Sequence, residues 1–331
     1  MDLPSIKTSF VEVTNKLPRK PPCKIYFKNE FEQPSGSFKL RGMGYLIYKS
    51  VEKARAQGKS NIEVFCSSGG NAGLAAAYAS AYYNLKCTVV LPIVSKKNVI
   101  EKLEFMGAKV IIYGKHWGEA DNHLKELIKN LDNSIYPVYA HPFDDELIWQ
   151  GHSQILTEII NEKQLDSFDD VKGVVCSVGG GGLYNGMIQG LNDLNSKAKV
   201  LAIETLQTPT FHETIKVGKI IHLEKIETLS NSLGSPYMSK KSFENYNLGN
   251  TKIEVLDDLD GVQGTLDLHD LFGYKVEPAC GVSVATVLHR LDIIEKNFQD
   301  LKPDDIIIIL VCGGSGINDE IIDFYRQLVA S

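Results

Sequence analysis

The chain has 331 residues, of which 43% are hydrophobic and 23% are charged, a composition ordinary for a globular protein in water. Its formal net charge of -6 and its pI of about 5.8 argue against nucleic acid or an anionic membrane as the main partner. The length is enough for two domains with sizeable cores.

Targeting and redox signals point to a reducing, cytoplasmic setting. The first five residues lack the basic region and apolar run of a secretory signal. No apolar segment approaches the roughly 18 residues that span a bilayer. No cysteine lies in a CxxC pair or a zinc-binding pattern, so we expect buried reduced thiols at Cys23, Cys66, Cys87, Cys176 and Cys280, whereas Cys312 belongs to a glycine-rich motif.

Short apolar segments alternate with longer segments of helical period. The predicted strands are Ile62–Ser67, Cys87–Leu91, Lys109–Tyr113, Gly173–Val178, Val200–Glu204 and Ile306–Val311. The predicted helices are Met43–Gln57, Ala72–Tyr83, Lys96–Phe105, Gly118–Leu131 and a segment through Tyr184–Leu191. Strands without polar residues suit parallel sheets covered on both faces, so the pattern predicts an α/β fold with right-handed crossovers.

The break near Pro137–Pro142 predicts a domain boundary. Residues 1–41 are too few for a domain of their own. We therefore expect a small domain of residues 42–137 inserted into a large domain of residues 1–41 and 138–331, with the ligand between the two.

The first chemical motif is a polar loop with one lysine, Pro34-Ser35-Gly36-Ser37-Phe38-Lys39-Leu40-Arg41-Gly42. The position of Lys39 alone favours a solvated side chain at a helix start. The helix dipole disfavours a cation there, and a partly desolvated lysine has a lowered pKa and can condense with an aldehyde.

Two further motifs lie between a strand and a helix. Ser67-Ser68-Gly69-Gly70-Asn71-Ala72-Gly73 offers exposed amides, hydroxyls and an amide side chain that could bind a carboxylate, although a plain turn with a serine N-cap is the alternative. Gly179-Gly180-Gly181-Gly182-Leu183 can converge backbone N–H groups on an anion. It matches neither a P-loop nor a dinucleotide fingerprint, so it predicts a phosphate site, with a flexible turn as the alternative.

The fourth motif, Val311-Cys312-Gly313-Gly314-Ser315-Gly316, places a thiol at the carboxyl end of a strand. Ligands of α/β proteins bind at that end. Considered without the other motifs, this one favours a buried structural role for Cys312.

Taken together, these motifs and Glu277-Pro278-Ala279-Cys280-Gly281 resemble the fold-type II enzymes that depend on pyridoxal 5′-phosphate (PLP), the tryptophan synthase β family. Within it the chain is most similar to the eukaryotic L-serine/L-threonine dehydratases. The resemblance implies two three-layer α/β domains with mostly parallel sheets and the cofactor in the cleft between them. It also implies an amino-acid substrate and a homodimer, without nucleic-acid or membrane partners.

By this resemblance, Lys39 carries PLP as a Schiff base and acts as the general base, while Phe38 and Ser232 lie on the two faces of the ring. Substrate carboxylate would bind at Ser68, Gly69, Asn71 and Ala72, with Asn71 also at the ring hydroxyl. The cofactor phosphate would lie on Gly179, Gly180, Gly181, Gly182 and Leu183, and Cys312 against the pyridine nitrogen. Glu204 and the Leu233 backbone would hold a monovalent cation, K⁺.

The resemblance implies β-elimination of L-serine to pyruvate and ammonia, and of L-threonine to 2-oxobutyrate. A thiol partner keeps the ring nitrogen neutral, which disfavours transamination. Serine racemases place a serine where this chain has Gly69, so the glycine favours elimination. Serine racemase and a threonine-preferring catabolic dehydratase remain alternatives. His141 is expected in a structural turn, and His152 and Glu277 are left without a role.

Overall fold

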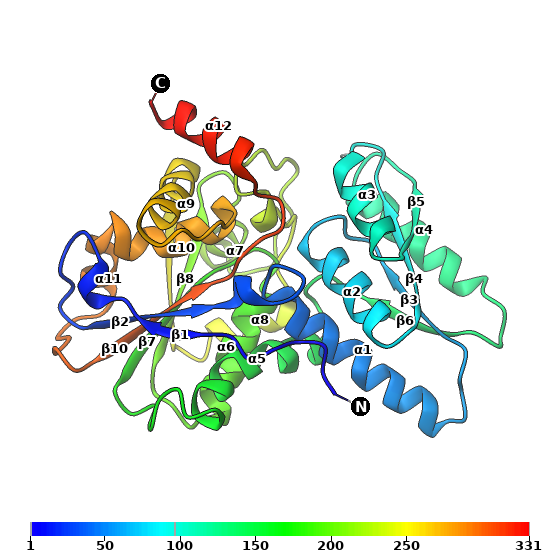
Figure 1. Cartoon of the computed structure of the whole chain (residues 1–331), viewed down its shortest axis with the longest axis horizontal. Coiled ribbons are helices and arrows are strands. Elements are labelled where there is room, and N and C mark those ends of the chain that lie inside the picture. The colour runs from blue at the N-terminus through cyan, green and yellow to red at the C-terminus, as the bar shows by residue number, and fades with distance from the viewer. Residues whose placement is uncertain (1, 96, 331) are drawn as a thin grey trace. The chain divides into compact units, whose positions relative to one another are not determined.

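The computed structural model describes residues 2–95 and 97–330, and two compact units divide the chain (Figure 1). The first takes in the chain up to Ile6 together with Gln33–Gly151. The second takes in Lys7–Glu32 and the chain from His152 onward.

The first unit is built on a parallel four-stranded sheet of order β5-β4-β3-β6. Its strands are β3 (Ile62–Cys66), β4 (Lys86–Leu91), β5 (Lys109–Ile112) and β6 (Tyr136–Ala140). Its helices are α1 (Lys39–Ala56), α2 (Asn71–Tyr82), α3 (Lys97–Phe105) and α4 (Trp117–Lys129). A helix precedes each strand and forms the crossover connection that parallel strands require.

Alternate residues of these strands build two separate cores. Val64 and Cys66 of β3 belong to a large cluster with α1, α2 and α3, whereas Phe65 points to the other face and packs with Ala120 and Leu124 of α4. Because side chains of a strand alternate between faces, apolar residues at every position bury both faces under helices.

The second unit contains a six-stranded sheet of order β1-β2-β10-β7-β8-β9, in which β1 alone runs antiparallel to its neighbour. The strands are β1 (Phe10–Glu12), β2 (Lys24–Asn29), β7 (Val171–Ser177), β8 (Lys199–Thr205), β9 (Thr251–Leu256) and β10 (Ile306–Val311). All six residues of β10 are buried, as expected for a central strand.

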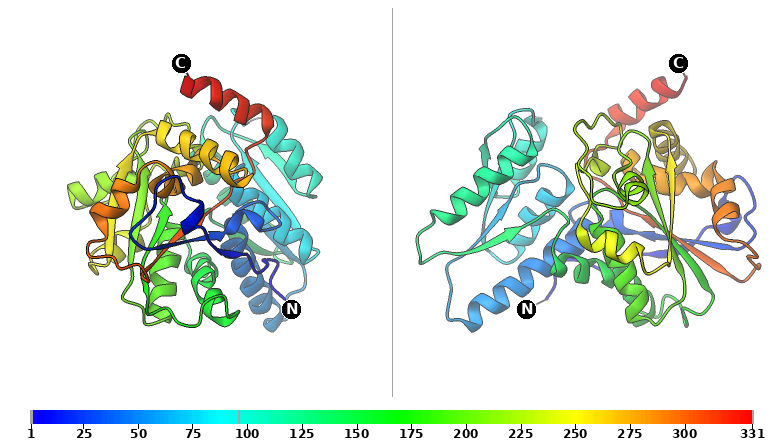
Figure 2. Two further views of the ribbon diagram at one scale, coloured as in Figure 1. Left: turned by 60° about the vertical axis from the view of Figure 1, so that its left-hand side comes forward. Right: turned by 180° about the vertical axis from the view of Figure 1, so that it is seen from behind.

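Helices cover both faces of this sheet (Figure 2). They are α5 (Glu146–Asn161, which begins in the first unit), α6 (Gly182–Asp193), α7 (Thr210–Val217), α8 (Lys240–Tyr246), α9 (Asp258–Phe272), α10 (Pro278–Leu288), α11 (Leu291–Asn297) and α12 (Asp319–Ala330). Helix α10 is buried along its whole length and packs against α9 and the sheet, so it shows no amphipathic period.

The α/β architecture with mostly parallel sheets is confirmed, and each predicted strand and helix exists; β10 has the predicted ends, and the others are shifted. The largest shift is in α1, which begins at Lys39 instead of Met43. Lys96, the first residue of one predicted helix, lies outside the described residues. Residues 33–41 and 138–151 were expected in the large domain. They cluster with the four-stranded sheet instead, because α1 and β6 belong to the layers of that sheet.

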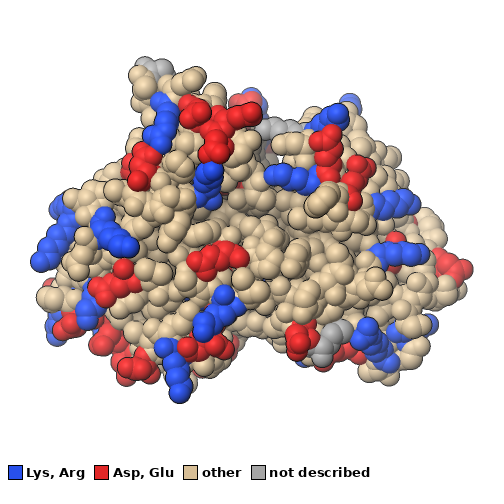
Figure 3. All heavy atoms as spheres, viewed as in Figure 1, with Lys and Arg blue, Asp and Glu red and all other residues tan. Residues whose placement is uncertain are grey.

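All six cysteines are buried free thiols. No described helix combines the length and apolarity needed to cross a membrane. On the face drawn in Figure 3, basic and acidic side chains are interspersed, and neither sign dominates.

Candidate functional site

Lys39 is the first residue of α1, and its side chain is half-buried. The amine donates a 2.7 Å hydrogen bond to the carbonyl of Pro142 and lies 5.3 Å from the ring centroid of Phe38. Pro142 follows β6, so the amine is held at the carboxyl edge of the four-stranded sheet. This is the partly desolvated, positioned amine that condensation with an aldehyde requires.

The Ser67–Gly73 loop reaches the same edge, because β3 pairs with β6 and Cys66 lies opposite Ala140. The Ser67 hydroxyl donates a 2.7 Å bond to Asp121, and the Ser68 hydroxyl accepts from the Gly70 amide at 3.3 Å. The N-cap of α2 is Gly70, without a side-chain bond, which is a correction to the serine N-cap considered from the sequence.

The first turn of α2 therefore begins at Asn71 with its amides unused by a cap side chain, which suits an anion. A Cβ at Gly73 would collide with the Ser68 carbonyl, so the loop can fold this closely over α2 only with glycine there. Ala72 is buried beside it.

Gly69 has little free space around it. A Cβ there would lie 3.1 Å from Leu91 Cδ2 and 3.3 Å from Val99 Cγ1. Both neighbours are apolar, so a serine at this position would have to displace them or turn its hydroxyl away from them.

In the second unit, Gly179–Leu183 connects β7 to α6. Gly181 has φ of +92°, a left-handed conformation that L side chains rarely adopt. A Cβ at Gly179 would lie 2.8 Å from the Leu233 carbonyl oxygen. The first N–H groups of α6 have no intrahelical acceptor, so this loop forms an anion cradle of the kind that binds phosphate.

A set of polar residues that the sequence analysis missed fixes the cradle. The Ser239 amide donates to the Gly180 carbonyl at 3.0 Å. Asn185 Nδ2 donates to the Ser239 hydroxyl at 2.9 Å, and Ser242 donates to Asn185 Oδ1 at 3.0 Å. All three side chains are buried, and no local signal could reveal partners that lie 54 and 57 residues apart.

Cys312 follows β10, the neighbour of β7, and its thiol lies 3.8 Å from the Ser177 hydroxyl. The thiol donates to the Leu310 carbonyl at 3.6 Å. A hydrogen bond from Cys280 holds the pKa of Cys312 below its usual value, against burial, and Ser177 contributes to the same effect. Burial raises the pKa of Cys280 well above its usual value.

Ser232 lies in a short 3-10 turn, η3 (Asn231–Leu233), and its hydroxyl donates to the carboxylate of Glu277. The other oxygen of Glu277 accepts from the Gly316 amide at 2.7 Å. Glu277, left without a role by the sequence, thus joins the turn packed on Gly179 to the loop that follows Cys312.

Glu204 is fully buried at the end of β8. Its two oxygens accept from the amides of Phe211 and His212, each at 2.7 Å, at the start of α7. Burial raises the pKa of Glu204 to about 8, although these two bonds act to lower it. The Leu233 carbonyl accepts from the Thr208 hydroxyl at 3.4 Å.

Each unit therefore gathers its own predicted residues at the carboxyl edge of its own sheet, where α/β proteins bind ligands. Of the histidines, His141 accepts through Nδ1 from the amides of Phe143 and Asp144, at 3.2 and 2.8 Å, which is the expected structural turn. His152 is fully buried. The Lys39 amine suits condensation with an aldehyde, and the glycine cradle, which has no room for a Cβ at Gly179 or Gly181, suits a phosphate group.

Residues 6–313 match the model of a protein family described as pyridoxal-phosphate dependent enzyme. An L-serine dehydratase of Saccharomyces cerevisiae (strain AWRI1631) is 45% identical over 91% of this chain and 90% of its own length. A catabolic L-serine/threonine dehydratase of S. cerevisiae (strain ATCC 204508 / S288c) is 42% identical over 90% and 84%. The crystal structure of a fungal L-serine ammonia-lyase from Rhizomucor miehei superimposes with a TM-score of 0.85 at 27% identity, covering 98% of this chain and 99% of that one.

Proposed function

Because the chain belongs to the family of pyridoxal-phosphate dependent enzymes, we propose that it is an ammonia-lyase that converts L-serine to pyruvate and ammonia, and L-threonine to 2-oxobutyrate and ammonia. The observation that carries this proposal is the 45% identity to an L-serine dehydratase along nine-tenths of both chains. The positioned amine of Lys39 supports it, because a partly desolvated amine held in place can condense with the cofactor aldehyde.

When bound, pyridoxal phosphate supplies an electron-withdrawing ring system that makes the Cα proton of an attached amino acid acidic. Lys39 would hold the cofactor and then, with its amine released, take the Cα proton as general base. The Pro142 carbonyl orients that amine through its hydrogen bond. Loss of the substrate hydroxyl as water leaves an enamine that hydrolyses to the keto acid and ammonia.

The remaining residues bind and orient. Gly179–Leu183 would hold the phosphate through backbone amides. Ser68, Gly69, Asn71 and Ala72 would hold the substrate carboxylate, with Asn71 also at the ring hydroxyl. Phe38 and Ser232 would lie against the ring faces, and Cys312 would face the ring nitrogen. A thiol would leave that nitrogen unprotonated. The neutral ring then withdraws electrons less strongly, which favours elimination over amino-group transfer.

A K⁺ ion is proposed at Glu204 and the Leu233 carbonyl. The chemistry of this donor set suits it, because the ion would bind oxygen ligands and would offset the cost of a buried carboxylate charge. We further propose a homodimeric assembly and a cytoplasmic location, both of which rest on the resemblance to the dehydratases.

Steady-state kinetics on L-serine, D-serine and L-threonine, with K⁺ exchanged for Na⁺, tests the proposal. The expected result is pyruvate and ammonia in equal amounts from L-serine, 2-oxobutyrate from L-threonine, and a lower rate in Na⁺. Conversion of L-serine to D-serine without pyruvate would identify a racemase, and no turnover of any of the three would overturn the proposed activity.

A further inference from the structure

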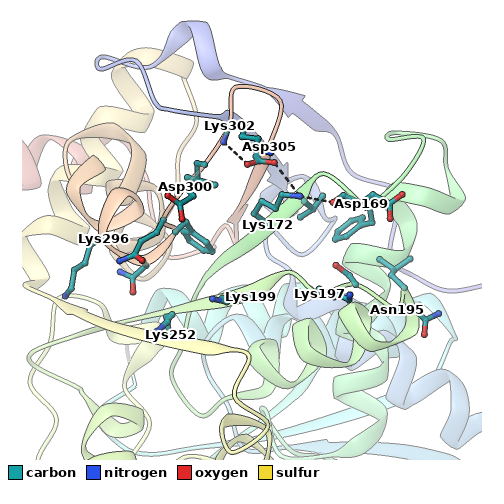
Figure 4. A pocket seen from close by; sticks show the side chains of 18 residues that line it. Asp169, Lys172, Asn195, Lys197, Lys199, Lys252, Lys296, Asp300, Lys302 and Asp305 are labelled. Carbon is teal, nitrogen blue, oxygen red and sulfur yellow. Dashed lines mark hydrogen bonds and ion pairs between the residues drawn. The ribbon is translucent and has the colours of Figure 1, made fainter.

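A cavity lies entirely within the second unit, at the amino edge of its sheet and so at the opposite end of the strands from Gly179 and Cys312 (Figure 4). Its lining includes the first residues of β7 and β8 and the loop that precedes β10. Its volume is about 850 Å³, which is in the range of small-molecule sites.

The lining is unusually basic for a chain with a net charge of -6. It holds three aspartates, Asp169, Asp300 and Asp305, and six lysines: Lys172, Lys197, Lys199, Lys252, Lys296 and Lys302. Two of the lysines are neutralised, since Lys172 pairs with Asp305 at 3.4 Å and Lys296 pairs with Glu254 at 2.7 Å. The ammonium groups of the other four form no ion pair with any described residue.

Strand register explains why these charges gather. Lys252 of β9 lies opposite Leu201 of β8, two residues beyond Lys199, so Lys199 and Lys252 project from the same face of adjacent strands. Gly173 of β7 lies opposite Lys199, and the position of its missing Cβ is filled by the ring of Phe298. The lysines therefore stand beside an apolar floor.

Figure 4 shows Lys197, Lys199 and Lys252 along one side of the pocket, and Lys172, Lys302 and Asp305 along the other. The C-terminal end of α6 also borders the cavity, through Leu194 and Asn195. The carboxylates of Asp169 and Asp300, which form no ion pair with the described residues, offset two of the four unpaired ammonium charges, and the helix end contributes about half a negative charge, so the lining keeps a positive balance. The ammonium groups repel one another, and an anionic ligand would remove that repulsion.

We propose that this cavity is a binding site for a polyphosphate, a ligand that carries two or more linked phosphate groups. Lysine ammonium groups act on phosphate as mobile point charges and need no fixed fork geometry. The four unpaired ammonium groups, of which the lining carboxylates offset two, call for two or more negative charges within one small ligand. Such a ligand is a nucleoside di- or triphosphate or an inorganic polyphosphate, and the two share the phosphate chain.

Calorimetric titration of the holoenzyme with inorganic tripolyphosphate, and separately with a nucleoside triphosphate, tests the proposal. We expect binding that weakens as salt is added and that falls at least about tenfold in the variant Lys197→Gln/Lys199→Gln/Lys252→Gln. Equal affinity for both probes would assign recognition to the phosphate chain alone. Tighter binding of the nucleoside triphosphate would add a contribution from the apolar floor.

The matched control removes the same charge from exposed lysines of the same unit that each pair with a glutamate: Lys216→Gln/Lys225→Gln/Lys240→Gln. It should keep wild-type affinity. Failure of the wild type to bind either probe, or equal losses in the two variants, would overturn the proposal.

A measurement on the wild type alone avoids any folding defect of the variants. Lysine acetylation footprinting should show slower labelling of Lys197, Lys199 and Lys252 when tripolyphosphate is present, with Lys216, Lys225 and Lys240 unchanged. Uniform protection of all six, or protection of none, would contradict the assigned site.

Discussion

The Ser232 hydroxyl donates its hydrogen bond to the carboxylate of Glu277, which also accepts the Gly316 amide. A single side chain thereby ties the turn beside the glycine cradle to the loop after Cys312. Loops of this kind keep their geometry only when their polar groups are paired.

The variant Glu277→Ala is expected to weaken cofactor binding and lower kcat. Loss of two hydrogen bonds to a charged acceptor costs about 1.5–3 kcal/mol each, which corresponds to at least tenfold in one of the two parameters. Equilibrium dialysis of PLP and pyruvate formation measure the effect. Glu277→Gln keeps an acceptor for Gly316 and should recover part of the loss; equal defects in both variants would argue that the charge itself matters instead.

Glycine at position 181 serves both conformation and space, since its φ is positive and a Cβ would collide with the Ser242 hydroxyl. Gly181→Ala is therefore expected to raise the dissociation constant of the cofactor. Gly218 also has positive φ but no atom within 4 Å of its Cβ position, so Gly218→Ala carries the backbone strain without the collision. Dialysis of both variants should show weaker PLP binding for Gly181→Ala only.

Gly69→Ser introduces a side chain 3.1–3.3 Å from Leu91 and Val99. We expect slower elimination, because the Ser67–Gly73 loop, proposed to bind the substrate carboxylate, must shift, together with some D-serine from a hydroxyl placed near Cα. Chiral chromatography of the products measures both effects. Complete absence of D-serine would remove Gly69 as the reason for preferring elimination to racemisation.

His289 lies between Asp260 and Asp267, with its ring nitrogens 3.5 and 2.8 Å from their carboxylates. Burial lowers the pKa of His289, but hydrogen bonds to both aspartates raise it overall from 6.5 to about 9. The stabilisation from the charged ring is therefore complete below pH 6.5 and is lost as the pH rises through about 9.

His289→Gln should accordingly lower the free energy of unfolding by about 1–2 kcal/mol below pH 6.5, a value reduced for solvent screening, and by much less above pH 9. Urea unfolding at both ends of this range measures it. The exposed His222→Gln serves as the control. A loss that does not change with pH would mean that packing, and not charge, makes the contribution of His289.

Much of the fold was open to prediction because parallel strands buried on both faces leave long apolar runs, as in β10. The strand β2 was not predicted, since it carries Lys28. This lysine is buried because its amine donates to the Thr8 carbonyl, Glu158 and Gln164, and the last two lie at least 130 residues away. Helix α10 was missed for the opposite reason. It is apolar on all sides, so it lacks a helical period.

The candidate site likewise combines local motifs that the sequence shows with tertiary partners that it does not show. Lys39, the Ser67–Gly73 loop and the glycine cradle stand out as local motifs between regular elements. The partners that hold them, such as Pro142 for Lys39 and Ser239 for Gly180, depend on tertiary contacts and have no sequence signature. Helical period placed the start of α1 at Met43, although the loop motif already indicated a helix start at Lys39, because the first residues of the helix carry no apolar period.

The most direct test of the account is to locate the lysine that carries the cofactor. Holoenzyme is reduced with borohydride in the absence of substrate, digested, and mapped by mass spectrometry. The account predicts one phosphopyridoxyl group per chain, on the peptide that contains Lys39, and pyruvate formation that is lost on reduction. A label on any other lysine, or an unlabelled chain that still turns over L-serine, would contradict it.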